Sequence, residues 1–125
     1  MLSYDYAIVR VLPRVERGEQ INAGVIFSCA KAGYLSSRFE LDEAALRCIA
    51  PGVDLEPIHA ALIGIEAVCR GGEAAGALGR LGVRERFHWL VAPRSTSVQV
   101  SAVHTGRCID LEAALDDLMN KMVRR

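Results

Sequence analysis

Charged and amide side chains surround a turn near the N-terminus, and together they could bind an anion. Four of them would line a polar pocket: Arg10, Arg14, Glu19 and Asn22. Asn22 and Gly24 interrupt an apolar run; a glycine inside a strand often marks a bulge or a close approach, and an asparagine there needs hydrogen-bond partners. The alternative is a charged hairpin loop in which Glu19 pairs with an arginine and Asn22 bonds to the backbone. Charged loop tips are common, which favours that alternative.

A second polar segment holds an arginine followed by three hydroxyl groups: Arg94, Ser95, Thr96 and Ser97. Side-chain and backbone donors in such a loop can hold an anion. His104 and Arg107 would face the same site if residues 98–103 form a returning strand. Otherwise the hydroxyls make local turn bonds and His104 caps the loop. The segment is long for a mere connection, so both interpretations stay open.

Sequence motifs of defined chemistry are absent from the chain. It contains no G-x-x-x-x-G-K-[ST], no G-x-G-x-x-G after a strand, no H-E-x-x-H and no G-x-S-x-G. His104 and Cys108 could form half of a zinc site, with His88 as a distant third ligand, or a thiol nucleophile and its base. Neither arrangement has its remaining groups. We therefore expect no metal and no cofactor, and we assign no catalytic residue.

The composition is that of one globular domain spanning residues 1–125. A chain of 125 residues has room for a single hydrophobic core, and its 51% hydrophobic content excludes disorder. The 15 basic and 15 acidic residues give a formal net charge of zero. This balance argues against a dedicated nucleic-acid or membrane-surface protein, but it leaves room for one compact anion site.

The N-terminus and the cysteines indicate the compartment. The first residues lack the basic and apolar regions of a signal peptide, and no apolar run approaches the roughly 20 residues of a membrane span. The four cysteines are widely spaced: Cys29, Cys48, Cys69 and Cys108. Scattered thiols suit a reducing compartment better than a disulfide framework. We expect a cytoplasmic protein that does not bind membranes.

The N-terminal third is predicted to form strands. Residues 4–12 are rich in tyrosine, isoleucine and valine and end at Pro13, which cannot donate to a strand ladder. Residues 21–30 are almost continuously apolar, which is typical of a strand covered on both faces. Residues 34–41 alternate between apolar and polar side chains, and Gly33 suits the short hairpin turn before them.

Helices follow in the middle of the chain. Asp42 can cap a short helix that ends before Pro51, and Asp54 can cap a longer one that ends at Arg70. The longer helix has one apolar stripe, formed by Ile58, Leu62, Ile65 and Cys69. Residues 73–82 contain three glycines and are predicted to form a weak helix or a loop.

The C-terminal third returns to strand and closes with a helix. Residues 86–92 are predicted to form a strand with Phe87, Trp89 and Val91 on its core face, and residues 98–104 a strand or an extended loop. Asp110 caps a last helix whose apolar stripe is Leu111, Leu115, Leu118 and Met122. We predict an α+β fold: a mainly antiparallel sheet with helices packed on one face, in a single compact domain.

The two polar segments and their flanks resemble a bacterial family of unknown function, DUF3037. The first block consists of residues 4–13 (YDYAIVRVLP), 17–19 (RGE) and 21–27 (INAGVIF); the second consists of 87–97 (FHWLVAPRSTS) and 104–106 (HTG). Relatives often carry prolines in the segment after the Arg-Ser-Thr run of residues 94–96, where Val100 and Ala102 stand here. The resemblance implies no activity. Some members are encoded beside kinase-like proteins similar to HipA, which implies a partner protein of that kind.

Two functions fit these observations. The first is a non-catalytic binding or accessory module that recognises a partner protein or a phosphate-bearing small molecule. The second is a small hydrolase or transferase acting on a phosphorylated or nucleotide substrate, with His104 as acid or base, Arg94 holding the anion and Glu19 orienting. Convergence of these side chains in one pocket would favour the enzyme. The oligomeric state is open, and we favour a monomer in which Leu118, Met119 and Met122 close the core rather than form a dimer face.

Overall fold

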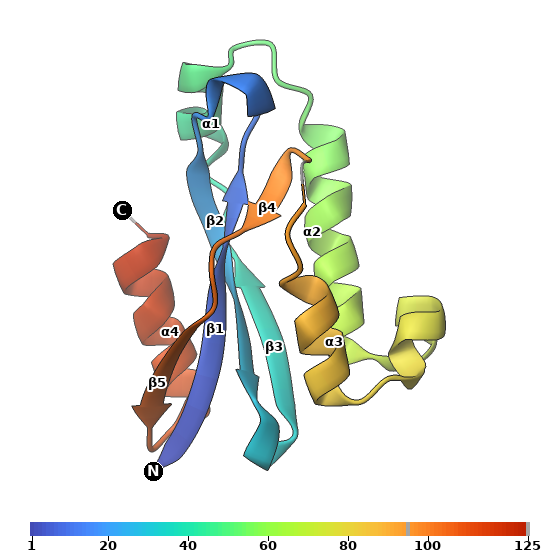
Figure 1. The fold of residues 1–125 in the computed structure, drawn as a ribbon. Helices are drawn as coiled ribbons and strands as arrows, with labels where there is room; N and C mark the ends of the chain where they lie inside the picture. The colour runs from blue at the N-terminus through green and yellow to red at the C-terminus, as the bar shows by residue number, and fades with distance from the viewer. Residues whose placement is uncertain (95, 125) are drawn as a thin grey trace.

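The described residues, 1–94 and 96–124, form a five-stranded antiparallel sheet in this computed structural model, with helices on both faces (Figure 1). The strands are β1 (Leu2–Val11), β2 (Ile21–Cys29), β3 (Tyr34–Phe39), β4 (Val98–Val100) and β5 (His104–Cys108). β2 lies between β3 and β1, while β4 and β5 both pair with the other edge of β1. The predicted α+β class with its mainly antiparallel sheet is confirmed.

The three N-terminal strands lie where the sequence predicts them. A 3-10 turn, η1 (Val15–Arg17), joins β1 to β2, and a second, η2 (Ala30–Ala32), joins β2 to β3 with Gly33 at a φ of 62°. Gly24 has both of the features expected of a glycine inside a strand. The pairing of β1 with β2 shifts register beside it, between Val9 and Arg10, and the ring of Phe39 lies across it.

The outer edge beside β1 consists of two short strands rather than one. β4 pairs with Val9–Val11 and β5 with Leu2–Tyr6, so residues 98–108 run along β1 with an interruption. At the interruption Ser101 replaces part of the ladder, because its Oγ accepts a hydrogen bond from the backbone N–H of Ile8 at 2.8 Å. The two alternatives for residues 98–104, strand and extended loop, thus each describe part of the segment.

Three helices pack on one face of the sheet: α1 (Glu43–Ile49), α2 (Leu55–Arg70) and α3 (Val83–Leu90). Asp42 and Asp54 cap α1 and α2 as predicted, each accepting a hydrogen bond from a backbone N–H of the first turn. The glycine-rich segment after α2 forms a 3-10 segment, η3 (Gly72–Arg80), interrupted at Gly76. None of the helices in the described part of the chain has both the length and the apolar character that a membrane span requires.

The strand predicted for residues 86–92 is wrong, because this segment belongs to helix α3. The alternation of Phe87, Trp89 and Val91 suggested a period of two residues. The side chains that face the core are instead Arg86, Phe87 and Leu90, which follow the helical spacing of three and four residues. With Arg86 taken as an outward-facing residue, the helical period is not apparent in the sequence. Trp89 is 44% exposed and does not lie in the core.

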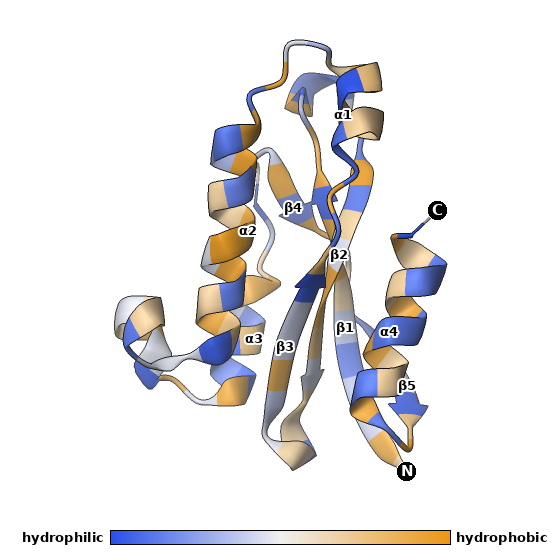
Figure 2. Ribbon diagram, turned by 180° about the vertical axis from the view of Figure 1, so that it is seen from behind, coloured by the Kyte–Doolittle hydropathy of each residue, from blue (hydrophilic) through white to orange (hydrophobic). Residues whose placement is uncertain are grey.

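Helix α4 (Leu111–Met122) packs on the opposite face, so the helices do not share one face as predicted (Figure 2). The reason lies in β2, whose apolar residues point in both directions. Ile26 faces α2 and α3, whereas Val25 and Phe27 face α4, and each side needs a cover. Leu118 and Met119 are buried against this second face, as expected of residues that close the core.

Ion pairs join α4 to β3 and to the residue after it. Arg124 pairs with Asp116 at 2.8 Å and with Glu40 at 2.5 Å, and Arg38 pairs with Glu112 at 3.0 Å. Arg38 also lies 3.5 Å from Asp116, so that carboxylate has two cationic neighbours. The network forms the polar border of the interface between α4 and the sheet.

The network should make stability depend on pH in the acid range. The hydrogen bond from Arg124 lowers the pKa of Asp116, so this group stabilises the fold above the usual carboxyl range, and the contribution is lost as the pH falls through the lowered pKa. We expect Asp116→Asn to lower the Tm at about pH 7, with a difference from wild type that shrinks progressively as the pH falls below about 4. Thermal unfolding followed by circular dichroism measures this. Glu73→Gln, an exposed acid of η3, is the control and should show no such pH-dependent difference.

Candidate functional site

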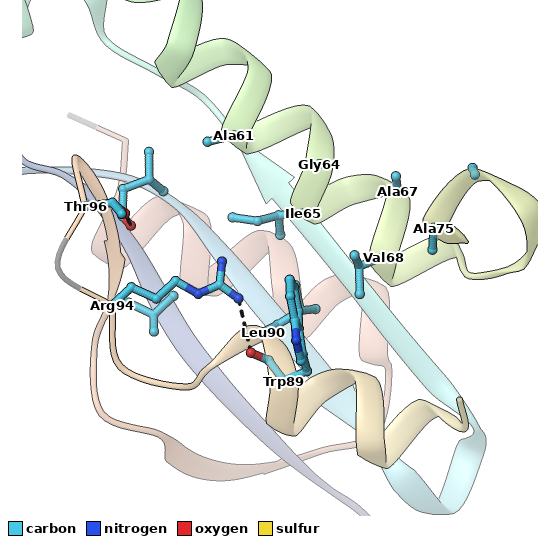
Figure 3. A pocket seen from close by; sticks show the side chains of 13 residues that line it. Ala61, Gly64, Ile65, Ala67, Val68, Ala75, Trp89, Leu90, Arg94 and Thr96 are labelled. Carbon is cyan, nitrogen blue, oxygen red and sulfur yellow. Dashed lines mark hydrogen bonds between the residues drawn. The ribbon is translucent and has the colours of Figure 1, made fainter. Parts of the chain in front are cut away.

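A cavity of about 330 Å³ lies where α2, η3, α3 and β4 meet (Figure 3). We call it the α2–α3 cavity. Small and branched apolar side chains form most of its wall: Ala61, Gly64, Ile65, Ala67, Val68, Ala74, Ala75, Leu90, Val98 and Val100. Trp89, Arg94 and Thr96 complete the lining. Gly64 has open space where a side chain would stand, so the absence of a Cβ there widens the cavity.

Arg94 and Trp89 form a stacked pair in this cavity. The guanidinium carbon of Arg94 lies 4.4 Å from the centre of the Trp89 ring, and Nη2 donates a hydrogen bond to the backbone carbonyl of Trp89 at 3.2 Å. Figure 3 shows Arg94 reaching from the loop before β4 to Trp89 of α3, opposite the small residues of α2. Within residues 1–94 and 96–124, Arg94 has no carboxylate partner. The guanidinium is therefore held in place with donors still available to a ligand.

Of the hydroxyl groups that follow Arg94, the one on Thr96 is used locally. Thr96 Oγ1 donates to the carbonyl of Val98 at 2.8 Å, as the turn-bond interpretation predicts. The backbone carbonyl of Ser97 accepts a hydrogen bond from Leu12 N–H at 2.7 Å. Ser95, which carries the remaining hydroxyl of the predicted site, lies outside the described residues. Arg94 and Thr96 thus share the α2–α3 cavity, whereas Ser97 lies in a separate hollow with Arg14, beside the first turn of α2.

The predicted N-terminal site is not one pocket. Glu19 pairs with Arg17 at 2.6 Å, which lowers the pKa of the carboxyl, as the hairpin interpretation predicts. Asn22 Nδ2 donates to the carbonyl of Met122 at 2.9 Å and so fastens β2 to the end of α4. Arg10 is paired with Asn22 across the strands, so both lie on the α4 face of the sheet, away from Arg94.

The enzyme alternative has no assembled set of groups. His104 pairs with Tyr6 of β1, and the two rings lie tilted against each other with their centres 5.5 Å apart, so His104 lies on the α4 face. The β1–β2 turn that carries Glu19 begins at the other end of β1, about 17 Å along the strand, and Arg94 lies on the face of α2 and α3. Cys108 is four residues from His104 on the same strand, about 13 Å away, too far to share a proton or a metal ion. Burial also raises the pKa of the Cys108 thiol, which disfavours a thiolate nucleophile.

Trp89 and the small residues of α2 are the site residues that sequence reasoning missed. The alternating pattern of residues 86–92 predicts a strand, and in a strand Trp89 lies in the core. A helical period would have placed it outside, next to Arg94. The alanines and glycine of α2 carry no chemical signal of their own, so only the packing of α2 against α3 reveals the cavity.

The comparisons with known proteins identify a family and no characterised relative. Residues 6–123 match the family model described as "Protein of unknown function (DUF3037)". No curated protein and no solved structure matches the chain. The match covers both polar segments and the helices between them.

Proposed function

The chain belongs to the DUF3037 family, whose function is unknown, and from that premise we propose that it is a non-catalytic binding module with its ligand site in the α2–α3 cavity. The observation that carries the proposal is the Trp89–Arg94 pair. Among the residues that the structure describes, this arginine has no carboxylate partner, and it stands in a cavity whose other walls are almost entirely apolar. Small-molecule sites typically combine an apolar cavity of about 300–1,000 Å³ with a few fixed polar groups.

The lining selects a ligand that joins an apolar body to an anionic group. The small side chains of α2 and η3 leave room for the apolar part beside Trp89. The free donors of Arg94 would bind a phosphate or a carboxylate, and the low polarity of the surroundings would strengthen that bond. Thr96 would add little as a donor, because its hydroxyl hydrogen is already given to Val98.

Two sources could supply this chemistry: a free small molecule, or a side chain of a partner protein such as the kinase-like protein implied by the family resemblance. Phenyl phosphate is the simplest probe that has both parts. Comparing it with a short phosphotyrosine peptide separates the sources. A peptide that binds much more tightly than phenyl phosphate indicates a protein partner, and equal affinity indicates a small molecule.

Trp89 lines the cavity and is the chain's single tryptophan, so its fluorescence reports on ligand binding at this site. We expect phenyl phosphate to change its fluorescence saturably, whereas phenol and inorganic phosphate, which each lack one of the two parts, bind far more weakly. Arg94→Gln should weaken phenyl phosphate binding about tenfold or more, since a charge-assisted hydrogen bond is lost. Because Arg94 lies against the Trp89 ring, Arg94→Gln itself changes the fluorescence. Calorimetry measures the affinity of each variant for phenyl phosphate without using that signal.

The matched control is Arg14→Gln, which removes an exposed arginine of the other hollow. It should leave the binding of phenyl phosphate unchanged. Equal weakening by Arg14→Gln and Arg94→Gln, or phenol binding as tightly as phenyl phosphate, would contradict the proposal.

A further inference from the structure

We propose a second binding site, separate from the α2–α3 cavity, that takes the pyrophosphate group of a small molecule. It is a cleft of about 610 Å³ between β1, β5, the β2–β3 turn and the start of α3, and we call it the β5 cleft. Besides Tyr4, its polar lining consists of Ser3, Asp5, Lys31, Arg84, Thr105 and Arg107. It shares no residue with the α2–α3 cavity, so the proposal does not depend on the function proposed above.

Strand pairing brings four of these side chains onto one face. Ser3 is paired with Arg107, and Asp5 with Thr105, across β1 and β5. Residues paired across antiparallel strands point to the same side, and residues two apart on one strand do so as well. Arg84 of α3 reaches Asp5 at 2.6 Å, which identifies that side as the α3 face.

The charges in the β5 cleft do not cancel. Asp5 is the one carboxylate of its lining, and Arg84 neutralises it directly. Two cations remain, Lys31 on the β2–β3 turn and Arg107 on β5. In the part of the chain that the structure describes, neither forms an ion pair. The cleft therefore has an excess of two positive charges, although the whole chain has a formal net charge of zero.

The positions of these cations indicate a ligand with more than one phosphate. Lys31 and Arg107 come from different walls, so a ligand that engages both needs anionic oxygens at both of its ends. A pyrophosphate group meets this requirement with two adjacent phosphates, and the hydroxyls of Ser3 and Thr105 can donate to the oxygens between them. A single carboxylate would leave one of the two cations without a partner.

Calorimetric titration with inorganic pyrophosphate at low ionic strength tests the proposal. We expect binding that weakens with added salt, and a loss of affinity of about tenfold for either Arg107→Gln or Lys31→Gln, since each removes a charge-assisted bond. Both positions are exposed, so the variants should keep the wild-type Tm. Arg80→Gln, an exposed arginine of η3 outside the cleft, is the control and should bind as wild type does.

Further titrants identify the source of the pyrophosphate group. Tighter binding of a nucleoside diphosphate than of inorganic pyrophosphate would assign the cleft to a nucleotide, and equal affinity to the free anion. A short single-stranded oligonucleotide that binds more tightly than either would overturn the assignment, because its phosphates are single and spaced apart. So would an affinity for pyrophosphate that Arg107→Gln and Lys31→Gln leave unchanged.

The two sites fail independently. If Arg94→Gln removes pyrophosphate binding while Arg107→Gln and Lys31→Gln do not, the anion binds in the α2–α3 cavity and the second site is refuted. If Trp89 fluorescence does not respond to phenyl phosphate while pyrophosphate still binds through Arg107, the function proposed for the α2–α3 cavity is refuted and the β5 cleft stands.

Discussion

Replacing Arg86 by alanine should lower the free energy of unfolding by about 3 kcal/mol, because one buried side chain makes three charge-assisted hydrogen bonds. Nη1 donates to the carbonyls of Val68 and Cys69, each at 2.8 Å, and Nε donates to the carbonyl of Leu81 at 3.0 Å. Arg86 is only 9% exposed. Alanine would leave the carbonyls without these donors and open a void between α2 and α3.

The carbonyls at the end of α2 explain why the arginine is tolerated in the core. The last carbonyls of a helix have no partner within the helix and carry partial negative charge. Arg86 satisfies two of them and crosses close to Gly71, where a Cβ would lie 2.8 Å from Nη1. The carbonyls at the end of α2 thus take the place of a carboxylate as partners of the guanidinium. The side chain of Arg86 fastens α3 to α2.

Urea unfolding measures the loss. Arg86→Lys should recover part of it, since an ammonium keeps the charge but has no second donor placed like Nε. Arg80→Ala, in the exposed part of η3, should stay within about 0.5 kcal/mol of wild type. If Arg86→Ala cost no more than Arg80→Ala, the hydrogen bonds of Arg86 would have no net role in stability.

Gly24→Ala is the second substitution with a large expected effect, a loss of about 3 kcal/mol. A Cβ at this position would lie 2.2 Å from Cδ1 of Phe39 and 2.4 Å from the backbone carbonyl oxygen of Arg38. The ring could move, but the carbonyl belongs to β3, which is paired with β2 along Gly24–Cys29. Relief of the clash therefore requires the two strands to separate.

Gly64→Ala provides the matched comparison, with the opposite sign. No heavy atom lies within 4 Å of a Cβ built there, and the residue is exposed in the middle of α2. We expect it to raise the free energy of unfolding by about 1 kcal/mol, as alanine does for glycine inside a helix. Urea unfolding of both variants gives the comparison. A Gly24→Ala protein as stable as wild type would show that β3 shifts freely.

Gly64→Ala also connects stability with binding. Its new methyl group would enter the α2–α3 cavity, so the more stable variant should bind phenyl phosphate less well. Glycine at position 64 makes α2 less stable than alanine would, but it leaves more room for a ligand in the α2–α3 cavity.

Local signals made much of the fold predictable. The three N-terminal strands followed from their alternating or continuous apolar runs, and Asp42, Asp54 and Asp110 each marked the start of a helix. These features depend on neighbours within a few residues. The face on which α4 packs is not local, because it depends on which side of β2 the other helices leave uncovered.

The errors at the C-terminal end also have one physical origin. Arg86 is a charged residue that faces inwards, so its helix had the hydrophobic pattern of a strand. That error placed Trp89 in the core and separated it from Arg94, a residue of the predicted polar segment. Arg94 and His104 are ten residues apart in sequence, yet the sheet puts them on opposite faces, and no spacing rule contains that information.

The interrupted strand pair beside β1 also has a consequence for the protein at high concentration. A long, regular, unpaired strand at the edge of a sheet can recruit a strand from another molecule and start aggregation. Here the ladder stops at Ser101, and β4 and β5 offer only three and five residues on either side of the break. Each piece is too short to hold an incoming strand well, so the break protects the chain from intermolecular sheet growth along this edge.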